Sequence, residues 1–166
     1  MTTWTMRIAC VLLALAPAAS ADKAKTTTAK NQKQAIMMTP NDMKWAPAPP
    51  DLPKGAQVTV LHGDPTKPGN YTLRFKVPDG YTIPPHWHSK DEELTVMQGT
   101  LILHLGDTME AESHDLTTGS YHYLPAKTHH GAQAKGETIV QIYGAGPFDI
   151  HYINPADNPN PKSARR

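Results

Sequence analysis

Two histidines separated by one residue, His86 and His88, stand just before Glu92, and this combination of side chains suits a divalent metal ion. On an extended strand successive side chains point to opposite faces, so His86 and His88 project in the same direction. Glu92 lies at an even offset from both histidines and can join them on that face. The spacing therefore predicts that one short segment supplies several ligands to a single metal ion.

The strands that must hold this segment are visible as short apolar runs. These runs are bounded by Gly, Pro, Asn or Asp at spacings of roughly ten residues, which is typical of an all-β domain. No segment has the apolar periodicity of a convincing amphipathic helix. The predicted strands cover residues 58–61, 71–77, 94–98, 100–105, 121–124, 138–143 and 150–153. A sandwich or barrel of β-strands follows.

The region from Gly80 to Gly99 resembles the first motif of the cupin superfamily, in which a glycine, a His-x-His pair, a glutamate and a second glycine occur at this spacing. The second cupin motif is matched by Gly119, Pro125 and His130. The resemblance implies that the metal ligands are His86, His88, Glu92 and His130.

Two positions depart from the second motif. Lys127 stands where the family usually has glycine, and Ala134 stands where asparagine is frequent. Neither residue is expected to touch the metal.

The resemblance extends to small, mostly exported bacterial single-domain cupins through residues 83–88, 125–128 and 146–148. It implies a double-stranded β-helix, or jelly roll, over residues 43–157, often dimeric, with the metal inside the barrel mouth. Cupins include dioxygenases, isomerases, decarboxylases, lyases and proteins with no known activity. The fold alone therefore selects no reaction.

Two neighbours compete with the proposed ligands, Glu93 beside Glu92 and His129 beside His130. Period-two alternation turns both to the opposite face, and the spacing to Gly99 favours Glu92. Whether Glu93 or His129 assists the site stays open. The remaining histidines outside the last strand are predicted to lie on strand or loop surfaces: His62, His104, His114 and His122.

Three further residues are weak candidates for the pocket. His151 falls in the last predicted strand, which can border a barrel cavity, and Tyr81 and Gln141 offer a hydroxyl and an amide beside apolar surface. For Tyr81 and Gln141, packing in the core is the alternative role.

Three neutral imidazoles and one carboxylate would leave a divalent ion with a net charge near +1 and open coordination positions. Such a site attracts anionic oxygen groups, so a small oxygen-rich organic molecule is the expected substrate. Fe would suit dioxygenation, Zn, Ni or Mn would suit Lewis-acid isomerisation, decarboxylation or elimination, and Cu also fits the donor set. An enzyme of one of these types is favoured. A non-catalytic metal-binding or ligand-binding cupin is the alternative, and a barrel with relic ligands is the third hypothesis.

The N-terminus has the pattern of a secretory signal peptide. Residues 1–21 contain a lone Arg7, an apolar run and the small-residue ending Ala19-Ser20-Ala21, so the general secretion route with cleavage after Ala21 is expected. The mature chain would then keep no cysteine, because Cys10 lies in the removed segment.

Residues 22–42 are predicted to form a flexible leader, and residues 158–166 a loose C-terminal tail. The Pro-rich segment around Trp45 is predicted to be an extended arm laid on the outside of the domain, and whether it crosses to a partner subunit stays open. Removing Arg7 lowers Lys+Arg from 16 to 15, equal to the 15 Asp+Glu residues. This neutral balance favours neither nucleic acid nor a membrane as partner after signal cleavage, and leaves a small molecule and a second copy of the chain as candidates.

Overall fold

The computed structural model describes residues 34–160. The predicted signal peptide, residues 22–33 of the predicted leader and residues 161–166 of the predicted tail lie outside the described residues. The chain divides into two units, Met1–Ala35 and Ile36–Arg166, and the second unit contains the fold. Within residues 34–160, no helix is both long and apolar enough to span a bilayer.

The described part of the chain is built almost entirely of strands, which confirms the all-β prediction. The strands pair antiparallel in the order β1-β2-β3-β8-β4-β9, and β5 pairs with β6, β7 and β8. The elements are η1 (Pro40–Asp42), β1 (Ala46–Pro47), β2 (Gln57–His62), β3 (Gly69–Val77), β4 (Thr82–Trp87), β5 (Glu92–Leu105), β6 (Glu112–Thr117), β7 (Tyr121–Leu124), β8 (His130–Gly146), β9 (His151–Tyr152) and η2 (Pro155–Asp157).

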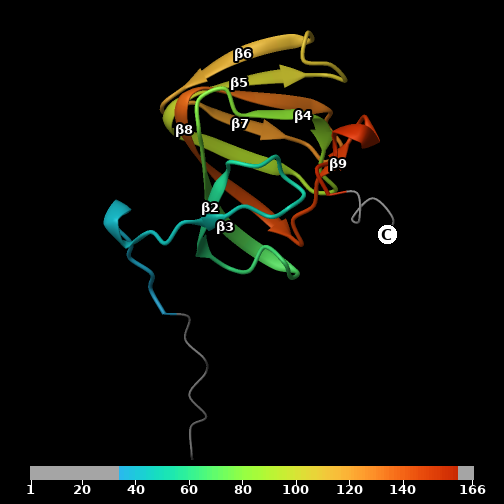
Figure 1. The fold of residues 1–166 in the computed structure, drawn as a ribbon. Coiled ribbons are helices and arrows are strands. Elements are labelled where there is room, and N and C mark those ends of the chain that lie inside the picture. The colour runs from blue at the N-terminus through green and yellow to red at the C-terminus, as the bar shows by residue number, and fades with distance from the viewer. Residues whose placement is uncertain (1–33, 161–166) are drawn as a thin grey trace, which may run out of the picture. The chain divides into compact units, whose positions relative to one another are not determined.

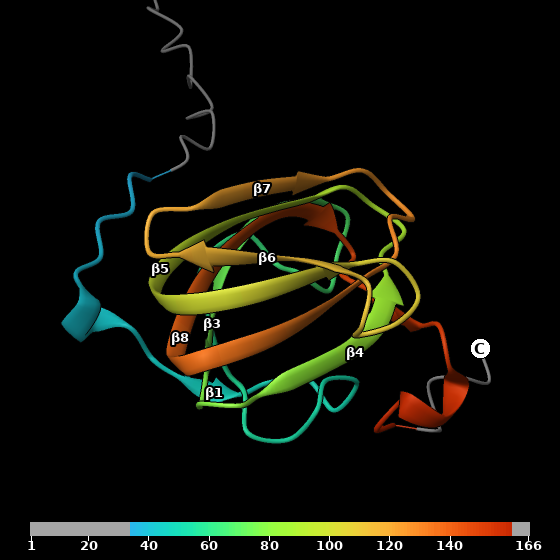
Figure 2. The same ribbon diagram turned by 90° about the horizontal axis from the view of Figure 1, so that it is seen from above.

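Two long strands organise the barrel. The second half of β8 pairs with β3, its first residues pair with β4, and β5 pairs with β8 over most of its length. Figure 2 shows β5 and β8 curving round the interior, while Figure 1 shows β5, β6 and β7 on one side and β2 and β3 on another. This is the jelly-roll arrangement expected of a cupin.

A bulge at Gly99 allows β5 to bend. The β5–β8 register shifts on both sides of Gln98, and Gly99 has a φ of 77°. A Cβ atom at Gly99 would lie 2.5 Å from the main-chain oxygen of Glu137. The sequence pattern predicted separate strands over 94–98 and 100–105, but the bulge joins them into one.

The core lies between the inward faces of β3, β5 and β8. Alternate residues of these strands, including Leu73, Val96 and Ile142, are at most 5% exposed. Leu52 belongs to the same cluster, so the segment before β2 also packs against the core. Such alternation is typical of strands that bury one face.

Three strands were absent from the prediction, namely β1, β4 and β6. β4 contains Pro84 and Pro85, which normally argue against a strand, and its pairing with β8 shifts register beside them. β6 pairs only with β5 and has no buried residue, so it lacks an apolar signal.

The Trp45 arm packs along its own chain in this structure. β1 pairs with β2, and the Lys76 ammonium lies 4.9 Å from the centre of the Trp45 ring. The charge of Lys76 thus lies over one face of the indole.

Candidate metal centre

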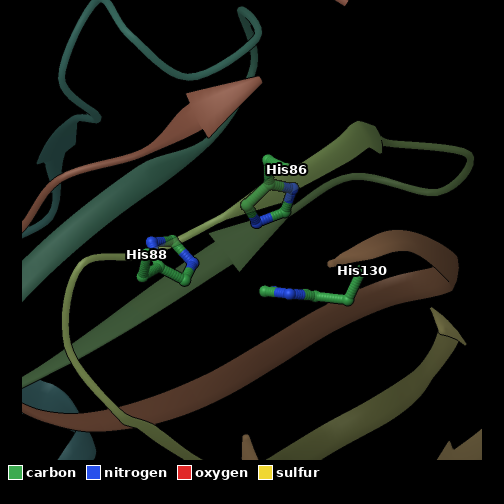
Figure 3. Close-up of side chains that lie close together, drawn as sticks. All are labelled: His86, His88 and His130. Atoms are coloured by element: carbon green, nitrogen blue, oxygen red, sulfur yellow. The ribbon is translucent and has the colours of Figure 1, made fainter. Parts of the chain in front are cut away.

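Three histidines from two distant parts of the sequence converge inside the barrel. His86 comes from β4, His88 from the loop that follows, and His130 is the first residue of β8 (Figure 3). His86 and His130 are register partners in the β4–β8 ladder. One ring nitrogen from each lies within 4.8 Å of the others, and all three residues are buried. The three side chains could hold a metal ion.

Main-chain carbonyls fix the orientation of all three rings. The Nδ1 atoms lie 2.7 Å from Pro84 O for His86, 2.5 Å from Asp149 O for His88 and 3.0 Å from Thr128 O for His130. Because a carbonyl oxygen only accepts hydrogen bonds, each Nδ1 carries the proton and donates it. The Nε2 lone pair of each neutral ring is then free, as in metal-binding histidines.

Glu92, the first residue of β5, adds a carboxylate to this group. Its Oε1 lies 3.7 Å from His88 Nε2, and its Oε2 lies 3.5 Å from His130 Nε2. Burial alone would raise the pKa of Glu92, but the hydrogen bonds with His122 and His130 outweigh it and hold the pKa well below its usual value. A buried negative charge therefore lies against the imidazoles, where a proton or a cation would neutralise it.

The single-strand geometry predicted for the motif is wrong in one respect. β4 ends at Trp87 and β5 begins at Glu92, so His88 lies in the connection between two strands rather than on one strand with Glu92. The side chains still meet because the chain turns at Ser89 and Lys90.

Burial and neighbouring charge set the protonation of the histidines. Burial, together with His130 and His88, holds the pKa of His86 well below its ordinary value, so this ring is neutral. Burial also lowers the pKa of His130, but the Glu92 carboxylate outweighs it and raises that pKa above its ordinary value. Without a cation, a proton between His130 and Glu92 stabilises the cluster.

The sequence reasoning missed His122. This residue was predicted to lie on the surface, but it is 9% exposed and its Nε2 lies 3.3 Å from Glu92 Oε2. Alternation within residues 121–124, between two tyrosines and ahead of Leu124, was the signal that could have placed it inward.

His104 is a second correction, because it was also predicted to be on the surface. It is 9% exposed, and neither of its ring nitrogens has a hydrogen-bond partner among the described residues. Its register partner on β8 is Gly131, where an added Cβ would lie 2.5 Å from the sulfur of Met109. Since β5 alternation turns His104 away from inward-facing Leu103, it is not part of the cavity wall. His62 and His114 are exposed as predicted.

The two rival residues point away from the site. Glu93 is exposed and accepts a hydrogen bond from the Tyr121 hydroxyl at 3.1 Å. His129 is exposed and its Nδ1 lies 2.5 Å from Asp107. Alternation along β5 separates Glu93 from Glu92, whereas His129 precedes β8 and lies on the surface beside Asp107.

Of the three weak pocket candidates, only Tyr81 lines the cavity, and its hydroxyl donates to Pro53 O at 2.8 Å. Gln141 is buried on the other face of β8, where its Oε1 accepts from Arg74 Nε at 2.9 Å. The His151 ring stacks on Trp87 with centroids 4.0 Å apart, outside the cavity wall.

The cavity that contains the histidines is small and mostly apolar. Its volume is about 60 Å³. Apart from Tyr81 and the five clustered side chains, namely the four expected ligands and His122, its walls are aliphatic or phenyl groups such as Phe75, Leu103 and Ile142. The space suits a compact molecule of which only one end is polar.

Comparisons with known proteins agree with this architecture. Residues 33–149 match the family model described as the ChrR Cupin-like domain. No curated protein shows significant sequence similarity to this chain. The polyketide cyclase RemF from Streptomyces resistomycificus has a similar structure, with a TM-score of 0.63 and 18% identity over 79% of this chain and 94% of that one.

Two solved dioxygenase structures are also similar. A putative acetylacetone dioxygenase from Methylibium petroleiphilum PM1 gives a TM-score of 0.59 and 20% identity over 79% of this chain and 89% of that one. An acetylacetone dioxygenase from Acinetobacter johnsonii gives a TM-score of 0.58 and 16% identity over 75% of this chain and 80% of that one. At these identities the similarity establishes the shared fold.

Proposed function

The chain belongs to the ChrR cupin-like family, and on this basis we propose that it is a metal-dependent protein that binds and transforms a small organic molecule. The proposed ligands are His86, His88, His130 and Glu92, holding one divalent transition-metal ion. Convergence of three carbonyl-anchored imidazoles on a buried carboxylate is the observation that carries the proposal.

The donor set of three nitrogens and one oxygen suits Fe, Zn, Ni, Cu or Mn, and leaves positions open for a ligand. A bound ion would supply charge that polarises an oxygen of the substrate. The protein's own contribution is to hold the nitrogens in place, to keep water out with apolar walls, and to orient the rest of the molecule.

The walls of the cavity narrow the class of substrate that we expect. Its aliphatic walls favour a compact apolar body, so the oxygen atoms of the molecule should be gathered at the end that meets the ion. An enolisable dicarbonyl compound such as acetylacetone meets this description and is a suitable first probe. Both oxygenation and Lewis-acid chemistry remain part of the proposal.

A non-catalytic binding function is the second candidate. It is favoured by the small number of polar side chains on the cavity wall, where the Tyr81 hydroxyl is already engaged by Pro53 O. Binding without turnover predicts a stoichiometric ligand that is recovered unchanged.

We also propose that the protein is exported, cleaved after Ala21 and loaded with metal outside the cytoplasm. The pattern of residues 1–21 supports this proposal. Homodimerisation is proposed from the resemblance to small cupins, and light scattering of the purified protein tests it.

The decisive experiment is to express the full chain with its own N-terminus in a bacterial host, purify the exported protein without chelator, and measure metal per chain by mass spectrometry. N-terminal sequencing of the same sample should begin at Asp22. Near-stoichiometric metal is expected. If the metal is iron, the next assay is oxygen consumption with acetylacetone. If it is one of the other metals, the next assays are Lewis-acid reactions and ligand binding.

The matched variants are His130→Ala and, as control, His62→Ala on the surface. His130→Ala should bind metal at least about 100-fold more weakly, since even changes behind the ligands cost 10–100-fold, while its circular dichroism should remain that of a β protein. Full metal occupancy in His130→Ala, or none in the wild type, would overturn the proposal.

A further inference from the structure

We propose that His122 is a ligand-binding residue of this centre, which holds Glu92 through Nε2 and offers Nδ1 as an acceptor to a hydroxyl or N–H group of the bound molecule. This inference rests on the proposed function and narrows its substrate class. The molecule should carry, on a compact apolar body, a metal-binding oxygen and a hydrogen-bond donor beside it.

The position of His122 follows from the pairing of β7 with β5. His122 is the register partner of Leu94, and Leu124 is the partner of Glu92. The neighbours Tyr121 and Tyr123 are 54% and 50% exposed, whereas His122 is 9% exposed. The strand therefore directs His122 inward, and its offset of two residues along the ladder brings the ring to the Glu92 carboxylate.

The contact with Glu92 defines which nitrogen carries the proton. His122 Nε2 lies 3.3 Å from Glu92 Oε2, and an ionised carboxylate can only accept hydrogen bonds. Nε2 must therefore carry the proton, which leaves Nδ1 of the neutral ring as an acceptor. This is the reverse of the arrangement in His86, His88 and His130, whose Nδ1 atoms donate to carbonyl oxygens.

The Nδ1 atom of His122 is buried and has no hydrogen-bond partner among the described residues. His122 lines the same cavity as the three clustered histidines, and the Tyr81 hydroxyl in that cavity is used by Pro53 O. An unpaired acceptor in apolar surroundings is unfavourable until a donor reaches it. A ligand that supplies this donor is favoured over one that does not.

These conditions describe small α-hydroxy or enolic carbonyl compounds. Their carbonyl or carboxylate oxygen can meet the cation, their hydroxyl can reach His122, and their alkyl groups can pack against residues such as Leu103. The cavity volume of about 60 Å³ suits molecules of this size.

The test compares two probes that differ in one donor, 2-hydroxyisobutyrate and its methyl ether, 2-methoxyisobutyrate. Metal content is measured first, and binding of each probe to the metal-loaded protein is then measured by calorimetry. The hydrogen bond to His122 should contribute about 10-fold to the wild-type preference for the hydroxy probe, the effect of roughly one hydrogen bond. Because the ether also weakens chelation, the quantity compared between variants is the ratio of the two affinities.

Three variants separate the two nitrogens of His122. His122→Gln keeps a donor near the Nε2 position and should retain metal but lose the contribution of His122 Nδ1 to the affinity ratio. His122→Asn keeps an acceptor near the Nδ1 position and should retain part of the preference. His122→Leu should lower the affinity ratio to the value that the weaker chelation by the ether alone produces, and the control His114→Leu on the exposed strand β6 should match the wild type.

The outcomes distinguish this inference from the proposed function. A wild type without metal would overturn the proposed function. A wild type that holds metal but binds neither probe, or a His122→Leu protein that keeps the full preference while its circular dichroism is native, would overturn the role of His122 alone.

Discussion

At the scale of single residues, the site depends on where each imidazole places its proton. Carbonyl oxygens of Pro84, Asp149 and Thr128 each accept a hydrogen bond from one Nδ1–H, so only the opposite nitrogens can bind a cation or a further proton. A cation and a proton therefore compete for the same lone pairs. His130 is where this competition is strongest, since Glu92 raises its pKa, whereas burial holds the pKa of His86 low.

Metal affinity should fall on acidification, beginning above the ordinary histidine pKa of about 6.5. The pKa of His130 is raised in the metal-free protein, so a proton occupies Nε2 at a pH where an unperturbed histidine would be neutral. Below that raised pKa, affinity should decrease about 10-fold per pH unit for one displaced proton. Metal titrations across pH measure this slope.

Glu92→Gln provides the companion measurement. Removing the carboxylate takes away the group that raises the pKa of His130. The pH at which metal affinity begins to fall should therefore be lower in this variant, although its metal affinity at neutral pH is weaker. An affinity that stays constant as the pH falls through the ordinary histidine range would contradict this assignment.

At the scale of elements, the bend in β5 allows one strand to carry both Glu92 at the site and residues of the core. Gly99 makes this bend with a φ of 77° at a point where the backbone of β8 approaches closely. The neighbouring Thr138 is fully buried, and its hydroxyl donates at 3.1 Å to Thr100 O or Gly136 O. The two long strands are therefore locked together at the bulge.

Gly99→Ala should destabilise the protein by about 2–4 kcal/mol, because a side chain there adopts a left-handed conformation and also collides with Glu137 O. Gly136→Ala is the matched control. Its φ of 76° is nearly the same, but no heavy atom lies within 4 Å of the added Cβ. Only the conformational cost, about 1–2 kcal/mol, is expected there. Urea denaturation measures the free energy of unfolding of both variants. Equal losses of stability would contradict the inferred collision between a side chain at position 99 and Glu137 O.

At the scale of the whole molecule, the clustered side chains connect strands that are far apart in sequence. His86 is on β4, Glu92 on β5 and His130 on β8, so an ion bound by all of them would link three strands of the barrel. A ligand that binds only the folded chain stabilises it by mass action.

Chelation should therefore lower the melting temperature. At a free metal concentration of 100 times Kd, the lost stabilisation is about 2.7 kcal/mol, which corresponds to roughly 10 °C for a domain of this size. Calorimetry with and without EDTA measures the shift. His86→Ala should melt at one temperature under both conditions, and a wild type insensitive to EDTA would contradict structural coupling through the metal.

Local sequence patterns were sufficient to predict the fold class, the two motifs and the histidines that converge. Motif spacing is a property of neighbouring residues, so the resemblance could single out His86, His88 and His130, whereas it left open whether Glu93 or His129 assists the site. The same local signal left β4 unassigned because of its prolines, and β6 because it buries nothing.

The surroundings of the convergent residues depend on tertiary contacts that no local pattern contains. His122 is 30 residues from Glu92, and their contact depends on the register of β7 against β5. The burial of His104, the outward stacking of His151 on Trp87 and the apolar character of the cavity likewise depend on which strands are neighbours. Such pairings are set by packing across the whole barrel, and a residue's neighbours along the chain do not specify them.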